Sequence, residues 1–371
     1  MPTLDIILIT YNRKEHLART LEQLFAEGSP VHRYGLTILN NASTDGSTDL
    51  INAYVERYPT LLKHILHPRN IGGNANIARA FELATAEYVW VLCDDDEFDF
   101  THWHTVEEAL AEGVDAVVVA NYVNPKKNLA QLACQLTFVP AAIYKTDLLD
   151  TTTLVNMYFN VAMMFPHFAL CATLLNKNKT IHIVDNWMVR MIPHADETSY
   201  VRGLDVYRTP LLSNMFWQVG FSNALQQIQC PEKQRQILEC LTFENENSSV
   251  FGGQNLIDGN DLVGRGSLWN LLTLYANLAC SKRLQRELMN AFFLTHVCRL
   301  RFHQDEVTTK LEVNHVKIKF WDNRWIGIRS FGFHQDAIAT KVSINNITFK
   351  LWDNRWIGIR PTSKQTTSKD A

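Results

Sequence analysis

Short apolar runs alternate with helical patterns along the first 200 residues, and this alternation constrains the fold more than any other feature. Leu4 to Thr10 is a nearly continuous apolar run, and leucines recur at helical spacing between Lys14 and Glu27. Further apolar runs occupy 36–39, 61–66, 88–92, 114–120 and 180–184, and helical patterns end at 58 and cover 75–85 and 167–175. Buried runs separated by helices are typical of a parallel sheet with helices on both faces. We therefore predict an α/β fold.

The pattern changes twice further along the chain. Helical periodicity dominates from about 205 to 303, interrupted by a Gly-rich loop between 251 and 266. Residues 305–329 and 336–360 then align at an offset of 31, with 14 of 25 positions identical and the block WDNRWIGIR in both copies. Apolar-polar alternation within each copy predicts strands, and the repeat predicts a duplicated unit. We expect a catalytic α/β domain (1–204), a helical subdomain (205–303), a duplicated β module (304–360) and a disordered polar tail (361–371).

Composition narrows the class of protein. The chain has 35 Lys plus Arg against 38 Asp plus Glu, a formal net charge of −3, which argues against a nucleic-acid partner. Its seven cysteines are scattered and form no CxxC pair, as expected of reduced thiols in a cytosol. The longest apolar stretch, 154–175, is broken by polar residues and by Pro166, so it is too interrupted to cross a membrane. We expect a cytoplasmic protein.

Polar residues follow three of the predicted strands. Thr10-Tyr11-Asn12-Arg13 follows the first, and Asn40-Asn41 begins a polar turn after the second. Open α/β sheets bind ligands beyond the carboxyl ends of their strands, so these residues are candidates for a binding site. The turn after Asn41 also suits a helix N-cap, which is the structural alternative.

The strongest local signal is the run Asp94-Asp95-Asp96-Glu97, directly after the strand that ends at Leu92. Four consecutive acids repel one another unless a cation or solvent offsets them. Hard divalent cations take carboxylate oxygens and share their other positions with phosphates. The run therefore predicts a nucleotide diphosphate held through Mg²⁺ or Mn²⁺, with a solvated acidic loop as the alternative.

Four segments in this order resemble the family 2 glycosyltransferases, which are inverting enzymes with the GT-A fold. They are ILITYNR (7–13), LNNASTDGSTD (39–49), RNIGGNANIARAFELA (69–84) and EYVWVLCDDDE (87–97). The third and fourth are most similar in style to members that transfer galactofuranose or rhamnose. The resemblance implies metal-dependent transfer from a nucleotide-diphosphate sugar to the hydroxyl of a saccharide or lipid-linked saccharide acceptor. Such reactions build capsule, O-antigen or cell-wall polysaccharides.

The resemblance also implies roles for individual residues. The segment Thr10 to Arg13, including Tyr11 and Asn12, would line the nucleoside pocket, and Asn40 and Asn41 stand where the family has residues facing the base or ribose. Asp94 and Asp96 match the family's DXD pair, which holds the cation, and Asp95 lies between them against the nucleotide sugar. Arg69 or Arg79 would reach the phosphates, unless each is an ordinary surface arginine.

The general base departs from the family, which commonly carries Glu-Asp at the start of a late helix. Here that dipeptide is Pro166-His167. An imidazole is a suitable base near neutral pH, so we predict His167 as the base, with Asp185 as the alternative. A histidine buried in the core is an equally good explanation of His167. His194 stands where some family members place a histidine on the metal.

The repeated module leaves several functions open. Its four tryptophans form a core, stack on sugar rings or anchor the module at a membrane interface; they are Trp321, Trp325, Trp352 and Trp356. The module would then bind a polymeric acceptor, or else mediate a homo-oligomer contact. A basic stretch at 282–301 leaves peripheral contact with the inner face of the cell membrane open, although an ordinary amphipathic helix explains it as well. Two other functional classes remain: a nucleotidyltransferase, and a catalytically inactive carbohydrate-binding protein on the same fold.

Overall fold

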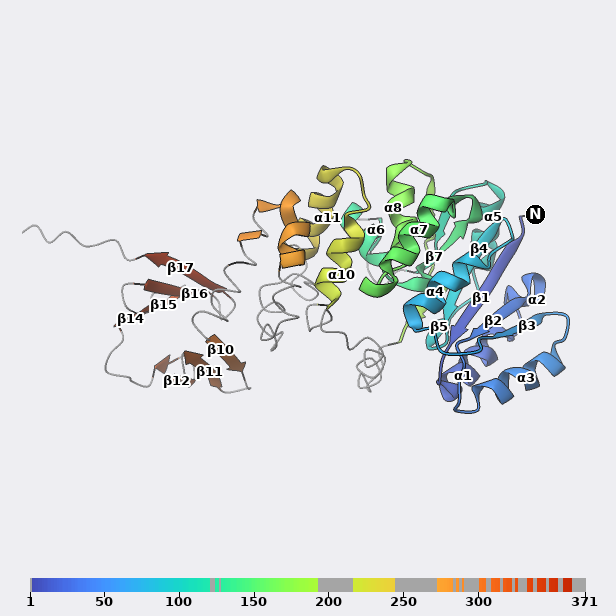
Figure 1. The fold of residues 1–371 in the computed structure, drawn as a ribbon, viewed down its shortest axis with the longest axis horizontal. Helices are drawn as coiled ribbons and strands as arrows, with labels where there is room; N and C mark the ends of the chain where they lie inside the picture. The colour runs from blue at the N-terminus through green and yellow to red at the C-terminus, as the bar shows by residue number, and fades with distance from the viewer. Residues whose placement is uncertain are drawn as a thin grey trace, which may run out of the picture. The chain divides into compact units, whose positions relative to one another are not determined.

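The chain folds into two compact units, one containing residues 1–251 and 264–285 and the other 252–263 and 286–371 (Figure 1). The computed structural model describes residues 2–120, 124–126, 128–192, 216–243, 272–282, 285–286 and 289, and the strands between 300 and 361.

A seven-stranded sheet forms the centre of the first unit, in the order β3-β2-β1-β4-β7-β6-β8. Its strands are β1 (Leu4–Thr10), β2 (Leu36–Asn40), β3 (Leu62–Leu66), β4 (Tyr88–Cys93), β6 (Ala116–Val118), β7 (Ala142–Lys145) and β8 (Ile181–Ile183). The pairs β1–β2, β1–β4, β2–β3 and β6–β8 are parallel, whereas β7 runs antiparallel to β4 and β6. The predicted α/β class, with a mostly parallel sheet, is confirmed.

Helices connect the strands and follow the predicted ranges closely in the first 100 residues. They are α1 (Lys14–Leu24), α2 (Val31–Tyr34), α3 (Ser47–Arg57), α4 (Gly73–Glu82), α5 (Trp103–Ala111), α6 (Leu129–Gln135), α7 (Thr151–Phe159) and α8 (Phe168–Asn176). Short 3₁₀ turns cover Val139–Ala141, Thr146–Leu148, Asn160–Met163 and Leu278–Cys280.

The strand order fixes where a ligand can approach this sheet. The chain steps outward from β1 to β2 to β3 and then returns to place β4 on the other side of β1. Because parallel crossovers are right-handed, the helices before β3 and the helix α4 after it cover opposite faces. The carboxyl ends of β1 and β4 therefore flank a topological switch point, where such sheets bind ligands.

An aromatic cluster supports the loop that follows β4. Trp90 is fully buried, donates from Nε1 to the carbonyl of Pro140 at 2.9 Å, and stacks on Trp103 with ring centroids 5.6 Å apart. Phe98 and Phe100 meet the Trp90 ring edge to face. Phe98 ends the short strand β5 (Asp96–Phe98), which pairs antiparallel with β9 (Val189–Met191). These contacts anchor the segment that follows the acidic turn, which we define as residues 94–97.

Two further helices, α10 (Phe216–Leu225) and α11 (Pro231–Phe243), belong to the same compact unit as the sheet. The helix α11 packs against α6, and α10 packs against α8. The predicted Gly-rich loop at 251–266 lies outside the described residues. Within the described part of the chain, no helix is both long enough and apolar enough to cross a membrane.

The second unit contains two four-stranded antiparallel meanders, as the sequence repeat predicts. The strands are β10 (Leu300–Gln304), β11 (Thr308–Val313), β12 (Val316–Trp321) and β13 (Arg324–Trp325), then β14 (Gly332–Gln335), β15 (Ala339–Ile344), β16 (Ile347–Trp352) and β17 (Trp356–Pro361). The two copies share their register, so that Lys310 pairs with Lys319 in the first and Lys341 with Lys350 in the second. The first meander begins at Leu300, before the expected boundary at 304. The predicted tail begins at 361, but β17 includes Pro361, and residues 362–371 lie outside the described residues.

Candidate functional site

The predicted strand ends converge at the switch point between β1 and β4. These strands end side by side, with Ile9 opposite Cys93 in the register. The Thr10 hydroxyl donates to Oδ2 of Asp94 at 2.5 Å. Arg13, just before α1, forms an ion pair with Asp94 at 3.4 Å and a closer one with Asp95. One cationic side chain thus serves two acids of the turn.

The acidic turn is buried rather than solvated. Asp94 and Asp96 are only 4% and 3% exposed. Burial, reinforced by the neighbouring carboxylates, raises the pKa of Asp94 to about 7 and holds the pKa of Asp96 well above its usual range. Burial and the same acids raise the pKa of the Cys93 thiol. Negative charge at this turn is therefore costly unless a further positive charge arrives, which argues against the solvated-loop alternative.

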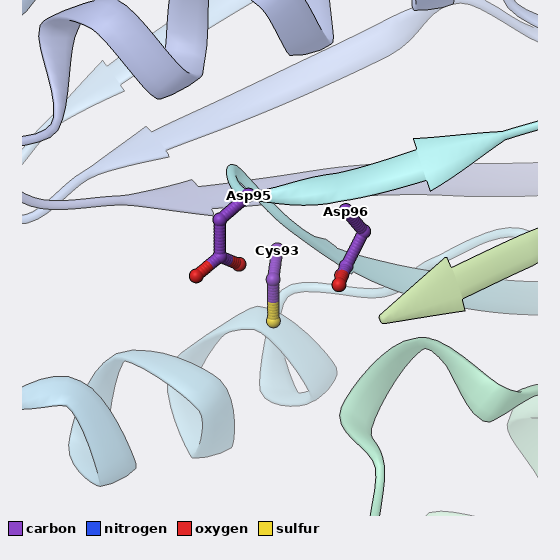
Figure 2. A group of neighbouring side chains, drawn as sticks. All are labelled: Cys93, Asp95 and Asp96. Carbon is purple, nitrogen blue, oxygen red and sulfur yellow. The ribbon is translucent and has the colours of Figure 1, made fainter. Parts of the chain in front are cut away.

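A divalent cation fits the donor atoms at this turn. Oδ2 of Asp96 is buried and has no hydrogen-bond partner. The ligand atoms of Cys93, Asp95 and Asp96 lie within 4.8 Å of one another, and Figure 2 shows the three side chains pointing to the same side. The predicted ligand Asp94 instead turns toward Thr10 and Arg13. The geometry therefore groups Asp96 with Asp95 and Cys93. Of these three residues, Cys93 is the one that the sequence analysis did not single out.

Two polar residues of α1 hold the backbone of the acidic turn. The Thr20 hydroxyl donates to the carbonyl of Asp94 at 3.0 Å. Gln23 donates to the carbonyl of Asp96 at 3.4 Å and accepts from the backbone N–H of Phe98 at 2.8 Å. The sequence analysis missed both residues. The available signal was a threonine on the helix face that also carries the buried leucines.

The predicted nucleoside segment, residues 10–13, is hydrogen-bonded to the loop that follows β2. Asn12 has a left-handed backbone, with φ of 51°, and its Oδ1 accepts from the backbone N–H of Thr44 at 2.7 Å. Its own N–H donates to the Ser43 hydroxyl at 3.0 Å. Tyr11, between Thr10 and Asn12, remains 40% exposed. Of this segment, the Tyr11 ring offers a surface to a ligand, whereas Asn12 joins two loops.

Asn40 and Asn41 are buried and bonded within the protein. Asn40 donates to the Thr48 hydroxyl at 3.0 Å and accepts from the N–H of Ser43 at 2.9 Å. Asn41 donates to Asn70 at 2.8 Å and accepts from the N–H of Ile71 at 2.9 Å. Both amides therefore shape the loops around the site.

Neither predicted phosphate-binding arginine is drawn into the acidic turn. Arg79 pairs with Glu82 at 2.7 Å on the exposed side of α4, and Tyr158 donates to the same carboxylate. Arg69 is exposed in the loop before α4. Among the predicted arginines, Arg13 alone reaches the acids.

Comparison with known proteins gives a family for the part of the chain that contains this site. Residues 5–178 match the family model described as glycosyl transferase family 2. The chain carries a family 2 glycosyltransferase domain.

Several known proteins are similar to parts of this chain. An uncharacterized protein of Mycobacterium tuberculosis is 34% identical over 97 residues, covering 26% of this chain and 27% of the relative. The abequosyltransferase RfbV of Salmonella typhimurium is 30% identical over 87 residues, covering 24% of this chain and 26% of the relative. Residues 1–349 of S. aureus TarS in complex with UDP-GlcNAc align with a TM-score of 0.49 and 14% identity, covering 88% of this chain and 99% of that one. The chain thus spans about a quarter of the length of the curated relatives.

The two predicted bases have their hydrogen-bond partners outside the acidic turn. His167 is 3% exposed, its Nε2 contacts the carbonyl of Thr137 at 2.9 Å, and burial lowers its pKa to about 4. Asp185 is exposed and pairs with Lys126 at 2.6 Å. Among the described residues, no hydrogen bond or ion pair joins either of them to residues 94–97. His194, the predicted metal histidine, lies outside the described residues.

Proposed function

We propose that this protein is an inverting glycosyltransferase that moves a sugar from a nucleotide-diphosphate donor to a saccharide hydroxyl during polysaccharide synthesis. One observation carries the proposal: a buried acidic turn with an unpartnered Asp96 oxygen, beside Arg13, at the switch point of a family 2 domain. The similarity to an abequosyltransferase supports transfer of a sugar. The finer likeness to galactofuranosyl and rhamnosyl transferases stays a prediction.

The donor would lie across the carboxyl ends of β1 and β4. The exposed ring of Tyr11 is placed to stack on the base. The Arg13 guanidinium, which now pairs with Asp94 and Asp95, is a cationic group beside the acidic turn, and its planar fork suits phosphate oxygens. Asp94 would orient Thr10 and Arg13 rather than bind the cation.

Asp95 and Asp96 would hold the cation through their carboxylates. A bound Mg²⁺ or Mn²⁺ would neutralise the charge that develops on the departing diphosphate. Thr20 and Gln23 fix the turn, so the carboxylates are positioned before the donor arrives. Inversion requires the acceptor hydroxyl to attack from the face opposite the diphosphate.

We assign His167 a structural role at the start of α8. Its ring is buried, and one nitrogen already contacts the Thr137 carbonyl. A base must come within hydrogen-bond reach of the acceptor hydroxyl, and a ring that is only 3% exposed is shielded from an incoming acceptor.

The burial of His167, the predicted base, favours a second candidate. This candidate is a carbohydrate-binding protein that keeps the fold without turnover. It predicts donor binding without release of the nucleotide diphosphate. An activity assay with and without metal separates the two candidates.

The duplicated module is proposed to hold the acceptor. Two similar meanders on one chain would raise the local concentration of a polymer through two weak contacts, without changing the chemistry. The proposed division therefore keeps catalysis in 1–204 and acceptor binding in the repeats, with the helices of 205–303 between them in sequence.

A panel of nucleotide sugars, including galactofuranose and rhamnose donors, tests the function. Each would be assayed for metal-dependent release of the nucleotide and for thermal stabilisation of the protein. We expect one donor to give both nucleotide release and thermal stabilisation in the wild type. The control variant Glu112→Gln, which neutralises an exposed acid outside the site, should behave in the same way. Asp96→Asn should give neither effect. Metal-independent binding of every donor would contradict the proposal.

A further inference from the structure

A cysteine sulfur lies among the carboxylates of the proposed cation site. Cys93 is the last residue of β4, and its Sγ belongs to the group within 4.8 Å that includes one oxygen each from Asp95 and Asp96. Figure 2 shows the thiol between the two carboxylates and on their side of the turn. Asp94, the residue between Cys93 and Asp95, faces Thr10 and Arg13 instead. The sulfur thus takes the place in this group that the sequence assigned to Asp94.

A second observation marks the same point as a cation position. Asp96 is 3% exposed, and its Oδ2 has no partner. The nearby guanidinium of Arg13 pairs with Asp94 and Asp95, not with Asp96. A buried carboxylate oxygen in this situation needs a positive charge or a hydrogen-bond donor. A cation held by this oxygen and by Asp95 would lie beside the Cys93 sulfur.

The other described cysteines lack this environment. Cys171 is buried in α8, and Cys230 is exposed before α11. Among the described residues, Cys93 is the only cysteine that groups with two carboxylates at metal-binding distances.

We propose that Cys93 is a sulfur ligand of the divalent cation, and that this site therefore holds thiophilic cations such as Zn²⁺, Co²⁺ and Cd²⁺ more tightly than Mg²⁺. The inference rests on the proposed function for the presence of a cation. Carboxylates alone suit Mg²⁺ and Mn²⁺, whereas a thiolate shifts preference toward softer ions. On binding, the Cys93 thiol releases its proton to solvent as the sulfur–metal bond forms. Softer ions would then compete with Mg²⁺ or Mn²⁺ for Asp95 and Asp96 and inhibit transfer.

The test is a titration of the full-length reduced protein with cadmium chloride, followed by the ultraviolet absorption band of cadmium–thiolate bonds. Cys230→Ser is the matched control, since it removes an exposed thiol outside the site. We expect wild type and Cys230→Ser to develop a band that excess Mn²⁺ suppresses. Cys93→Ser should lose the Mn²⁺-sensitive part of the band, with an unchanged circular dichroism spectrum.

A second measurement separates the inference from the proposed function. Electron paramagnetic resonance of free Mn²⁺ reports binding to the oxygen ligands without relying on activity. Cys93→Ser should still bind Mn²⁺ because Asp95 and Asp96 remain. If Mn²⁺ binds but the Mn²⁺-sensitive cadmium band survives in Cys93→Ser, the sulfur ligand is refuted while the cation site stands. If neither protein binds Mn²⁺, with or without a nucleotide diphosphate, the cation site itself and the proposed function fail.

Discussion

Replacing His167 with glutamine should remove a pH-dependent part of the stability of this fold. Burial lowers the pKa of His167 to about 4 from 6.5. The folded state therefore binds fewer protons than the unfolded state between these values. The stability contributed by the neutral ring is fully present above pH 6.5 and is lost as the pH falls toward 4.

The magnitude follows from that difference. At about 1.36 kcal/mol per pKa unit, the complete loss is roughly 3 kcal/mol, and about 2 kcal/mol of it falls between pH 7.5 and pH 5. Glutamine does not titrate, and its side-chain N–H₂ can still donate to the Thr137 carbonyl that His167 contacts. His167→Gln should therefore lose about 2 kcal/mol less than wild type over this interval.

The assay is chemical denaturation of both proteins at pH 7.5 and pH 5, followed by circular dichroism. The difference between the two proteins isolates His167 from the other twelve histidines, which they share. A proton titration of the His167 ring by NMR gives the folded pKa directly. Equal losses in both proteins, together with a ring that titrates near 6.5, would refute the buried, neutral assignment.

Three further predictions concern the site and the module. His167→Gln should keep turnover within about tenfold of wild type. Loss of a positioned base typically costs about 10²- to 10⁴-fold in turnover. A drop of that size with unchanged donor binding would show that His167 is the base. Without metal, Asp96→Asn should melt at the wild-type temperature or above it, because the substitution removes a buried acid whose Oδ2 has no partner. The variant should also lose the metal-dependent rise in melting temperature that a nucleotide diphosphate gives the wild type. Retention of that rise would exclude Asp96 as a ligand. Removing residues 300–371 should leave donor release intact for short acceptors and slow it for long ones. A changed oligomeric state by size-exclusion chromatography, or loss of donor binding, would instead assign the repeats a structural role.

Local signals in the sequence predicted the strands that carry the site. The run Leu4 to Thr10 is the strand as observed, and the apolar run at 88–92 differs from β4 only by Cys93. Continuous apolar runs and leucine spacing are properties of neighbouring residues, so they need no tertiary information. The switch point then follows from the order of parallel strands.

Side-chain direction within the site was not predictable in the same way. Asp94 and Asp96 have the same residue type and nearly the same burial, yet the Asp94 carboxylate contacts Thr10 and Arg13 while Oδ2 of Asp96 has no hydrogen-bond partner. That difference arises from a segment more than 80 positions away in sequence. Arg79 is different, because its spacing from Glu82 is that of a helical ion pair on an exposed face, a local signal that our sequence analysis did not use.

The common register of the two meanders has an electrostatic consequence. Each copy places one lysine directly opposite another, Lys310 opposite Lys319 and Lys341 opposite Lys350. Like charges on facing positions of a sheet destabilise it, so the shared register predicts the same cost in each copy. Residues 300–361 contain ten Lys and Arg against six Asp and Glu, within a chain whose overall charge is negative. Dissolved salt, which screens such repulsion, should therefore strengthen the meanders, and a polymer bearing carboxylates or phosphates should strengthen them at far lower concentration than a neutral one.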